Sequence, residues 1–167
     1  AMSSVMNELA DTVAALAARV QRLEDELAIH RVIIRYGLAA DVGDGDAAAA
    51  TFTPDGTYDV DVGRMDGRAA IATLLRGERH QGMVGHCAHQ IGPAVVHELA
   101  TDRAVATGYS RVYLETHAGT HVYRVSFNRW ELVKRNGEWL IARRTTRRLG
   151  LGDTTAVLTG GIGSISS

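Results

Sequence analysis

The sequence predicts an α+β fold, in which helices come first along the chain and a sheet of long antiparallel strands follows. Apolar residues recur at helical spacing up to residue 42 and again near residue 71, whereas from residue 84 onward the segments have the spacing of strands. Turns containing glycine, such as "HAGT" and "RNGE", separate most of these later segments. The chain has 167 residues, 46% of them hydrophobic and 22% charged, which fits one ordinary globular domain.

The first element is a long helix, predicted from about Asn7 to Val42 and interrupted only by Gly37. Its apolar residues repeat at alternating spacings of four and three, which is a heptad pattern. They are Leu9, Val13, Leu16, Val20, Leu23 and Leu27. Three heptads are near the minimum for a coiled coil, so this stripe fits either an oligomer contact or a helix that lies along the outside of its own domain.

Shorter elements follow this helix. The stretch "GDGDAAAATFTPDG" predicts a short alanine-rich helix, with Asp44 or Asp46 as its N-cap, and then a turn. Next come a strand in "GTYDVDVG" and a helix in "DGRAAIATLLRGERHQG". Strands are predicted over residues 84–91, 94–99, 103–116, 120–134 and 138–149. Because large residues occupy both faces of the long strands, we expect another copy of the protein to cover the second face.

The overall charge gives no reason to expect nucleic acid or a membrane surface as a partner. Lys and Arg number 18 against 19 Asp and Glu, a formal charge of −1. The basic cluster "RRTTRR" is interpreted as a solvated strand end. No signal peptide or membrane span is apparent, and the single cysteine, Cys87, cannot form an internal disulfide. We therefore expect a cytoplasmic location.

Several segments in order resemble the SnoaL-like group of the nuclear-transport-factor-2-like superfamily. They are "RYGLAADVGDGDAAAATFTPDGTYDV", then "GRAAI", a histidine-bearing strand, and "NGEWLIARR" near the end. The resemblance implies a cone-shaped, curved antiparallel sheet wrapped by helices (an α+β barrel) around a ligand cavity. Relatives include dehydratases, a dehydrochlorinase and isomerases that act on hydrophobic or cyclic molecules, mostly without metals. The division is then a helical extension over residues 1–23, the SnoaL-like domain over 24–149 and a flexible tail over 150–167.

Two residues match the catalytic pair of the dehydratase and dehydrochlorinase branch. The resemblance assigns the aspartate at the end of the first long helix to Asp41 and the strand histidine to His86. A neutral imidazole can accept a proton near neutral pH, and a carboxylate on its other nitrogen would fix the tautomer and stabilise the imidazolium. The alternatives are a helix-end carboxylate that caps the next turn and a satisfied core histidine. Strand alternation places His86 with Ala88 and Gln90, opposite Cys87 and His89.

The same resemblance suggests substrate-binding residues. The cationic residue five positions after the last-strand tryptophan falls on Arg144, and a polar residue on the first helix falls on Tyr36. Gln90 stands where the dehydrochlorinase has asparagine, and Tyr109 or Arg111 would lie near the second pocket histidine of the dehydratase. Structural alternatives are a cross-sheet ion pair for Arg144, simple packing for Tyr36 and the oligomer face for Tyr109.

Simple strand alternation places Arg144 on the same face as Leu140 and Ala142, opposite Trp139 and Ile141.

No metal or cofactor is predicted. The histidines of "HCAH" are three apart, which puts them on opposite faces of a strand, and a buried structural thiol is the preferred interpretation of Cys87. Taken together, these features predict a cofactor-independent lyase, dehydratase or isomerase that abstracts a proton from a hydrophobic cyclic substrate. The alternative is a non-catalytic ligand-binding or assembly module. A homo-oligomer is expected, either a trimer as in the dehydratase branch or a dimer as in the isomerase branch.

Overall fold

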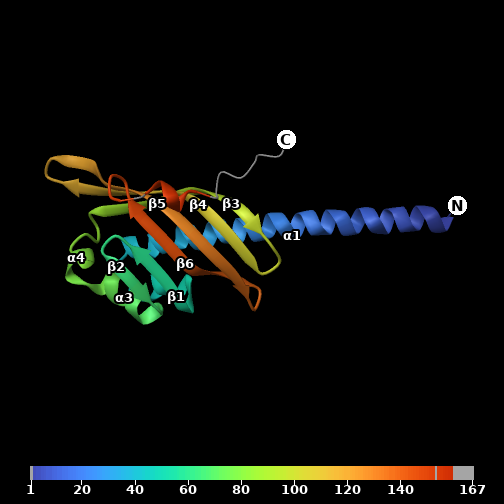
Figure 1. The fold of residues 1–167 in the computed structure, drawn as a ribbon, viewed down its shortest axis with the longest axis horizontal. Helices are drawn as coiled ribbons and strands as arrows, with labels where there is room; N and C mark the ends of the chain where they lie inside the picture. Colours follow the sequence, from blue (N-terminus) through green and yellow to red (C-terminus); the bar gives the residue numbers. More distant parts are fainter. Residues whose placement is uncertain (1, 153, 160–167) are drawn as a thin grey trace.

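The computed structural model describes residues 2–152 and 154–159 and confirms the α+β fold (Figure 1). Helices pack on one face of a curved sheet of six strands. The helical elements are α1 (Met2–Asp41), α2 (Gly45–Ala50), α3 (Arg68–Arg76), α4 (Glu78–Gln81) and the 3-10 helix η1 (Thr155–Val157). The strands are β1 (Phe52–Val60), β2 (Gly63–Asp66), β3 (Cys87–Leu99), β4 (Arg103–Thr116), β5 (Gly119–Arg135) and β6 (Glu138–Arg148).

The sheet is mixed, so the prediction of a wholly antiparallel sheet is wrong at one strand pair. The strand order is β2-β1-β6-β5-β4-β3, and β1 pairs with β6 in parallel. After β2 the chain crosses through α3 and α4 to the far edge, and the meander from β3 to β6 then returns to β1. The meander reverses the chain direction at each turn, so β6 runs in the same direction as β1. The alternation of side chains within a single strand does not reveal the direction of that strand relative to β1.

Helix α1 has two parts with different surroundings. Its C-terminal part packs on β3, β6 and α2, whereas its N-terminal part extends away from the domain (Figure 1). The buried positions begin at Asp25 and continue through Ile29 and Ile33 to Tyr36 and Ala40. All six residues of the predicted heptad stripe are more than half exposed. The helix is therefore a core element over its second half only.

Three local differences from the predicted elements have clear causes. The strands expected over residues 84–91 and 94–99 form one strand, β3, with a register shift between Ile91 and Ala94, where the Gly92–Pro93 peptide is cis. A proline that cannot donate to the ladder is accommodated at such an irregularity. The short strand β2 was not predicted. Of the two candidate N-caps, Asp44 is the one used, and it accepts a hydrogen bond from the Ala47 amide at 2.9 Å.

The hydrophobic core lies between the helices and the inner face of the sheet. Its largest fully buried side chains include Trp130, Phe52, Ile29, Ile71 and Ile141. Within the expected tail, η1 packs against β5 and β6, while residues 153 and 160–167 lie outside the described residues. None of the helices described is long and apolar enough to cross a membrane.

Candidate functional site

A cavity of about 190 Å³ lies between α1, α3, α4 and the inner face of the sheet. Most of its wall is apolar, and polar side chains from several separate elements also line it. The apolar lining includes Val60, Leu75, Met83, Ile91 and Val112. The polar groups include Tyr36 from α1, His80 from α4, His89 from β3 and Arg144 from β6, and Arg79 and Arg124 also line the cavity. An apolar hollow with a few convergent polar groups is typical of a small-molecule site.

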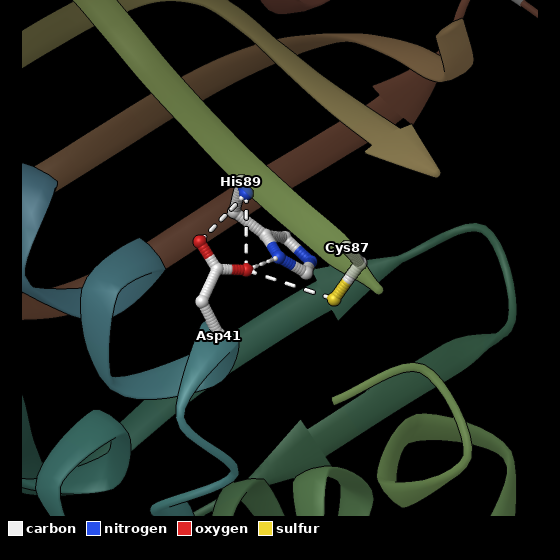
Figure 2. Close-up of side chains that lie close together, drawn as sticks. All are labelled: Asp41, Cys87 and His89. Carbon is white, nitrogen blue, oxygen red and sulfur yellow. Dashed lines mark hydrogen bonds and ion pairs between the residues drawn. The ribbon is translucent and has the colours of Figure 1, made fainter. Parts of the chain in front are cut away.

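Asp41 pairs with His89, so the predicted contact between Asp41 and His86 is wrong. His89 Nδ1 lies 2.6 Å from Asp41 Oδ1 (Figure 2). The backbone amide of His89 donates to both carboxylate oxygens, at 3.0 and 2.8 Å. These bonds join the last residue of α1 to the start of β3. They satisfy the half-buried carboxylate and hold the imidazole ring beside the cavity.

His86 lies outside this site for a reason of strand geometry. It precedes β3, its side chain is exposed, and it lines a different hollow beside residues 114–117. The predicted alternation, with His86 on one face and His89 on the other, agrees with the structure, but the inner face is that of His89. Ile91 shares the parity of His89 and is buried. This apolar neighbour is the signal that could have identified His89 from the sequence.

Gly37 allows α1 to approach β3 closely enough for the Asp41–His89 contact. A Cβ atom added at Gly37 would lie 2.9 Å from the carbonyl oxygen of His89 and 3.1 Å from a side-chain carbon of Ile91. Any larger residue would therefore push the helix away from the strand. The glycine predicted to interrupt the helix is thus needed for this helix–strand contact.

The surroundings of His89 favour its neutral form. Burial lowers the pKa of His89 below its ordinary value, although the hydrogen bond and charge of Asp41 act in the opposite direction. His80 lies next to it, with the two ring centroids 5.8 Å apart. The Nε2 atom of His80 is 2.8 Å from the Ala40 carbonyl oxygen, which requires an N–H at that position. Sequence reasoning missed His80 because it lies on a short helix with no strand alternation to orient it.

Arg144 lies in the cavity as predicted, but on the opposite parity from the one expected. A register shift between Glu131 and Leu132 opposite β6 turns Arg144 to the inner face together with Trp139 and Ile141. Such a bulge changes which residues face the core and gives no clear pattern in a single strand.

Arg144 is a buried cation with incomplete hydrogen bonding. It is 3% exposed, and its Nε and Nη2 donate to Asn128 Oδ1 at 3.1 and 2.9 Å. Its guanidinium carbon lies 4.7 and 4.9 Å from the ring centroids of Tyr36 and Tyr58. Among the described residues, Nη1 has no hydrogen-bond partner and no ion pair involves Arg144. A buried, unpaired guanidinium N–H is costly unless a ligand oxygen accepts from it.

Tyr36 is placed in the cavity as predicted. Its ring is buried and makes edge contacts with Phe52 and Tyr58. Burial, and after it the neighbouring Tyr58, raises the pKa of the Tyr36 hydroxyl well above its ordinary value. This hydroxyl is therefore protonated near neutral pH and can act as a hydrogen-bond donor.

The other two predicted substrate-binding residues face away from the cavity. Gln90 is exposed and accepts a hydrogen bond from the Tyr113 hydroxyl at 2.9 Å. Tyr109 is 45% exposed and packs edge-on against Phe127. Both therefore lie on the outer face of the sheet, where coverage by another copy stays a prediction.

Cys87 completes the cluster around Asp41. Its Sγ lies 3.7 Å from Asp41 Oδ1, and Figure 2 shows the thiol and His89 on the same side of β3. One ligand atom each from Asp41, Cys87 and His89 lie within 4.8 Å of one another, a spacing that could hold a metal ion. Burial and the charge of Asp41 raise the pKa of the Cys87 thiol, which disfavours the thiolate that metals bind. The cluster is better described as a carboxylate that accepts several hydrogen bonds.

Comparison with known families agrees with this architecture. The model of the SnoaL-like domain matches residues 21–145, most of the chain. The chain belongs to the SnoaL-like family. A search of curated proteins found no match to the sequence.

Solved structures of similar fold include relatives from two bacteria. An NTF2-like protein with a cystatin-like fold from Novosphingobium aromaticivorans is 38% identical, with a TM-score of 0.81, covering 86% of this chain and 94% of its own. A function-unknown Mycobacterium tuberculosis protein, solved as an Asp-to-Asn variant, is 26% identical, with a TM-score of 0.72 and coverages of 86% and 83%. A proposed scytalone dehydratase from N. aromaticivorans is 19% identical, with a TM-score of 0.65 and coverages of 75% and 85%. The last likeness shows the fold alone.

Proposed function

We propose that this SnoaL-like protein is a cofactor-independent lyase, such as a dehydratase, or an isomerase, which removes a proton from a hydrophobic cyclic substrate. His89 is the base, and Asp41 orients it. The observation that carries the proposal is the 2.6 Å contact between His89 Nδ1 and Asp41 Oδ1 at the wall of an apolar cavity. A base supported in this way is the usual arrangement for general acid–base catalysis.

The hydrogen bond to Asp41 determines which nitrogen of His89 can react. In neutral His89, Nδ1 carries the hydrogen donated to the carboxylate, so the lone pair is on Nε2. Nε2 takes a proton from a carbon next to a substrate carbonyl, and the electron pair of that C–H bond forms an enolate. The imidazolium then returns the proton to another carbon, which isomerises the substrate, or donates it to a departing hydroxyl group, which releases water. Asp41 stabilises the imidazolium in either case.

Arg144 would stabilise the negative oxygen of the enolate. Its guanidinium group is held by Asn128, through Nε and Nη2, and by the two tyrosine rings, so it needs little reorganisation when charge develops. The neutral Tyr36 hydroxyl is a second donor beside the same space.

The size of the cavity limits the substrate. An apolar protein cavity of about 150 Å³ accommodates benzene. The cavity here, about 190 Å³, suits a compound of one ring, or two small rings, with a carbonyl group.

Deuterium exchange provides a direct test of proton abstraction and does not require the natural substrate. A panel of one-ring and two-ring cyclic ketones is incubated in D₂O with the protein, and exchange at the carbon next to the carbonyl is followed by NMR. We expect His89→Gln to slow exchange by about 10²-fold or more, while His86→Gln, the matched control, exchanges at the wild-type rate. If His86→Gln lost the exchange activity while His89→Gln kept it in full, the assignment of His89 as the base would be rejected. Ligands that raise the wild-type melting temperature without any catalysed exchange would indicate the binding module instead.

The same site can be tested for its oxygen-binding group. We expect Arg144→Gln to weaken binding of a one-ring phenolate, measured by calorimetry, by about tenfold or more. Arg143→Gln is the control, because Arg143 pairs with Asp59 instead of lining the cavity. Equal phenolate affinity in Arg144→Gln and wild type would contradict this role.

A further inference from the structure

The first half of α1 is a long helix that carries an apolar stripe, and no described residue of the domain covers this stripe. Residues 2–24 are all exposed, and the stripe runs from Met6 to Leu27 with side chains between 51% and 63% exposed. Isolated helices are marginal in water, and most helical stability in proteins comes from packing of an apolar face. A partner on this stripe would supply that packing.

For helices that run in parallel, the residue types along the stripe favour two strands. When the heptad is assigned from the spacing, the a positions are Met6, Val13, Val20, Leu27 and Ile34. The d positions are Leu9, Leu16, Leu23 and His30. β-Branched residues at a with leucine at d favour a parallel dimer over a trimer or tetramer. The two central heptads, with valine at a and leucine at d, follow this rule.

The charges beside the stripe are complementary between two identical helices. In a parallel dimer, a g residue faces the e residue five positions later on the other helix. Arg19 at g would face Glu24 of the second copy, and Glu26 at g would face Arg31 of the second copy. Both pairs join opposite charges, and each occurs twice by symmetry. Among the described residues, the one intrachain ion pair these four make is between Glu26 and His30, at 4.0 Å.

The domain leaves this face of α1 free. Over the second half of the helix, Ile29, Val32 and Tyr36 are buried against the domain, whereas Leu27 and Ile34 remain 55% and 46% exposed. Positions 27 and 34 lie on the opposite side of the helix from 29 and 36, because residues two apart are rotated by about 200°. The stripe therefore continues past the point where the domain begins, and a second helix can lie along it without meeting the sheet.

We propose that two copies of this chain pair through α1 as a parallel, in-register, two-stranded coiled coil, with the two domains on the outside. The proposal is independent of the catalytic proposal, since the interface contains none of the cavity residues. It selects the dimer from the two oligomeric states considered for the family resemblance and identifies α1 as the surface that forms it.

Sedimentation equilibrium of the full chain over a range of concentrations tests the interface. We expect a dimer for the wild type, and a shift to monomer for Leu16→Lys, which places a charge at a central d position. Ala18→Lys adds the same charge two residues away at an outward f position, and it should remain dimeric. Residues 16 and 18 are both exposed in the single chain, so neither change disturbs the domain core. A wild-type monomer or trimer, or a Leu16→Lys variant that remains dimeric, would overturn the proposal.

A charge swap tests the parallel register. Glu24→Arg places a second guanidinium group opposite Arg19 of the other copy, so we expect the dimer dissociation constant to increase several-fold. The double variant Arg19→Glu with Glu24→Arg restores opposite charges and should recover wild-type affinity. Antiparallel or shifted helices do not bring positions 19 and 24 together, so failure of the double variant to recover affinity would reject the parallel arrangement.

Discussion

Helix α1 carries two carboxylates that are buried to different degrees and have different partners. Asp25, where the helix first meets the domain, accepts hydrogen bonds from Lys134 Nζ at 2.7 Å and from Trp139 Nε1 at 2.9 Å. Asp41, where the helix ends, accepts from the ring and the backbone amide of His89. The first carboxylate joins the helix to β5 and β6, and the second joins it to β3 beside the cavity.

The hydrogen-bond partner determines what each of these two carboxylates can do. Burial alone would raise the pKa of Asp25, but hydrogen bonds from Lys134 and Trp139 outweigh it and lower the pKa overall. Lysine and tryptophan side chains do not ordinarily titrate near neutral pH, so the contact is purely structural. The imidazole beside Asp41 does titrate in that range. On one helix, we therefore expect an aspartate to support the proposed reaction at position 41 and to hold the fold together at position 25.

The largest expected effect is on catalysis, from Asp41→Asn. The amide can donate to His89 Nδ1 and hold the ring in the wrong tautomer, so we expect the rate of substrate deuterium exchange to fall by about 100-fold or more. The free energy of unfolding should fall by only about 1 kcal/mol, because the oxygen of the amide still accepts from the backbone. Both quantities are measured on one preparation, by NMR exchange and by urea denaturation. A catalytic loss of less than threefold would end the contrast with Asp25.

The reverse pattern is expected for Asp25→Asn. The amide loses the ion pair with Lys134, and the free energy of unfolding in urea should fall by about 2 kcal/mol. Exchange activity of the folded fraction should stay at the wild-type level. Asp11→Asn is the matched control, because Asp11 is exposed on the projecting part of α1, and its effect should lie within about 0.5 kcal/mol. Equal stability losses at positions 11 and 25 would remove the structural role of Asp25.

The smallest effect on activity and stability is expected from a change of pH. It again distinguishes the His89–Asp41 pair from Asp25. The pKa of His89 is lowered in the folded state from 6.5, so the protonated, inactive ring accumulates only below that pH, and exchange should decline there. The unfolded chain takes up this proton first, so stability also declines as pH falls below 6.5. Asp25 has a lowered pKa, and its contribution is present above 3.8 and lost only as pH falls below that value.

Stability curves of wild type, His89→Gln and Asp25→Asn check this assignment. His89→Gln should remove most of the decrease in the free energy of unfolding just below pH 6.5, and Asp25→Asn should leave this decrease unaltered. If Asp25→Asn shifted the pH at which this decrease occurs, the two carboxylates would be coupled.

The candidate site was predicted in part, and the successes and errors have physical causes. Tyr36 and Arg144 were placed correctly at the cavity, since they lie on a helix face and on a strand matched by the resemblance, and Asp41 lies behind the cavity wall in contact with His89. His89 was missed because the resemblance assigned the strand histidine to His86, and alternation gives two faces without saying which is the inner one. Gln90 was assigned to the pocket by the same error.

The sequence by itself determined the order of elements, the two faces of β3 and the heptad stripe of α1, because these depend on local periodicity and turn chemistry. The tertiary structure alone decided that β1 runs parallel to β6, that His89 faces Asp41, and that a bulge turns Arg144 inward. Each of these depends on contacts between residues far apart in the chain, such as the approach of α1 to β3 at Gly37. Local patterns do not encode which face of a strand a distant helix will cover.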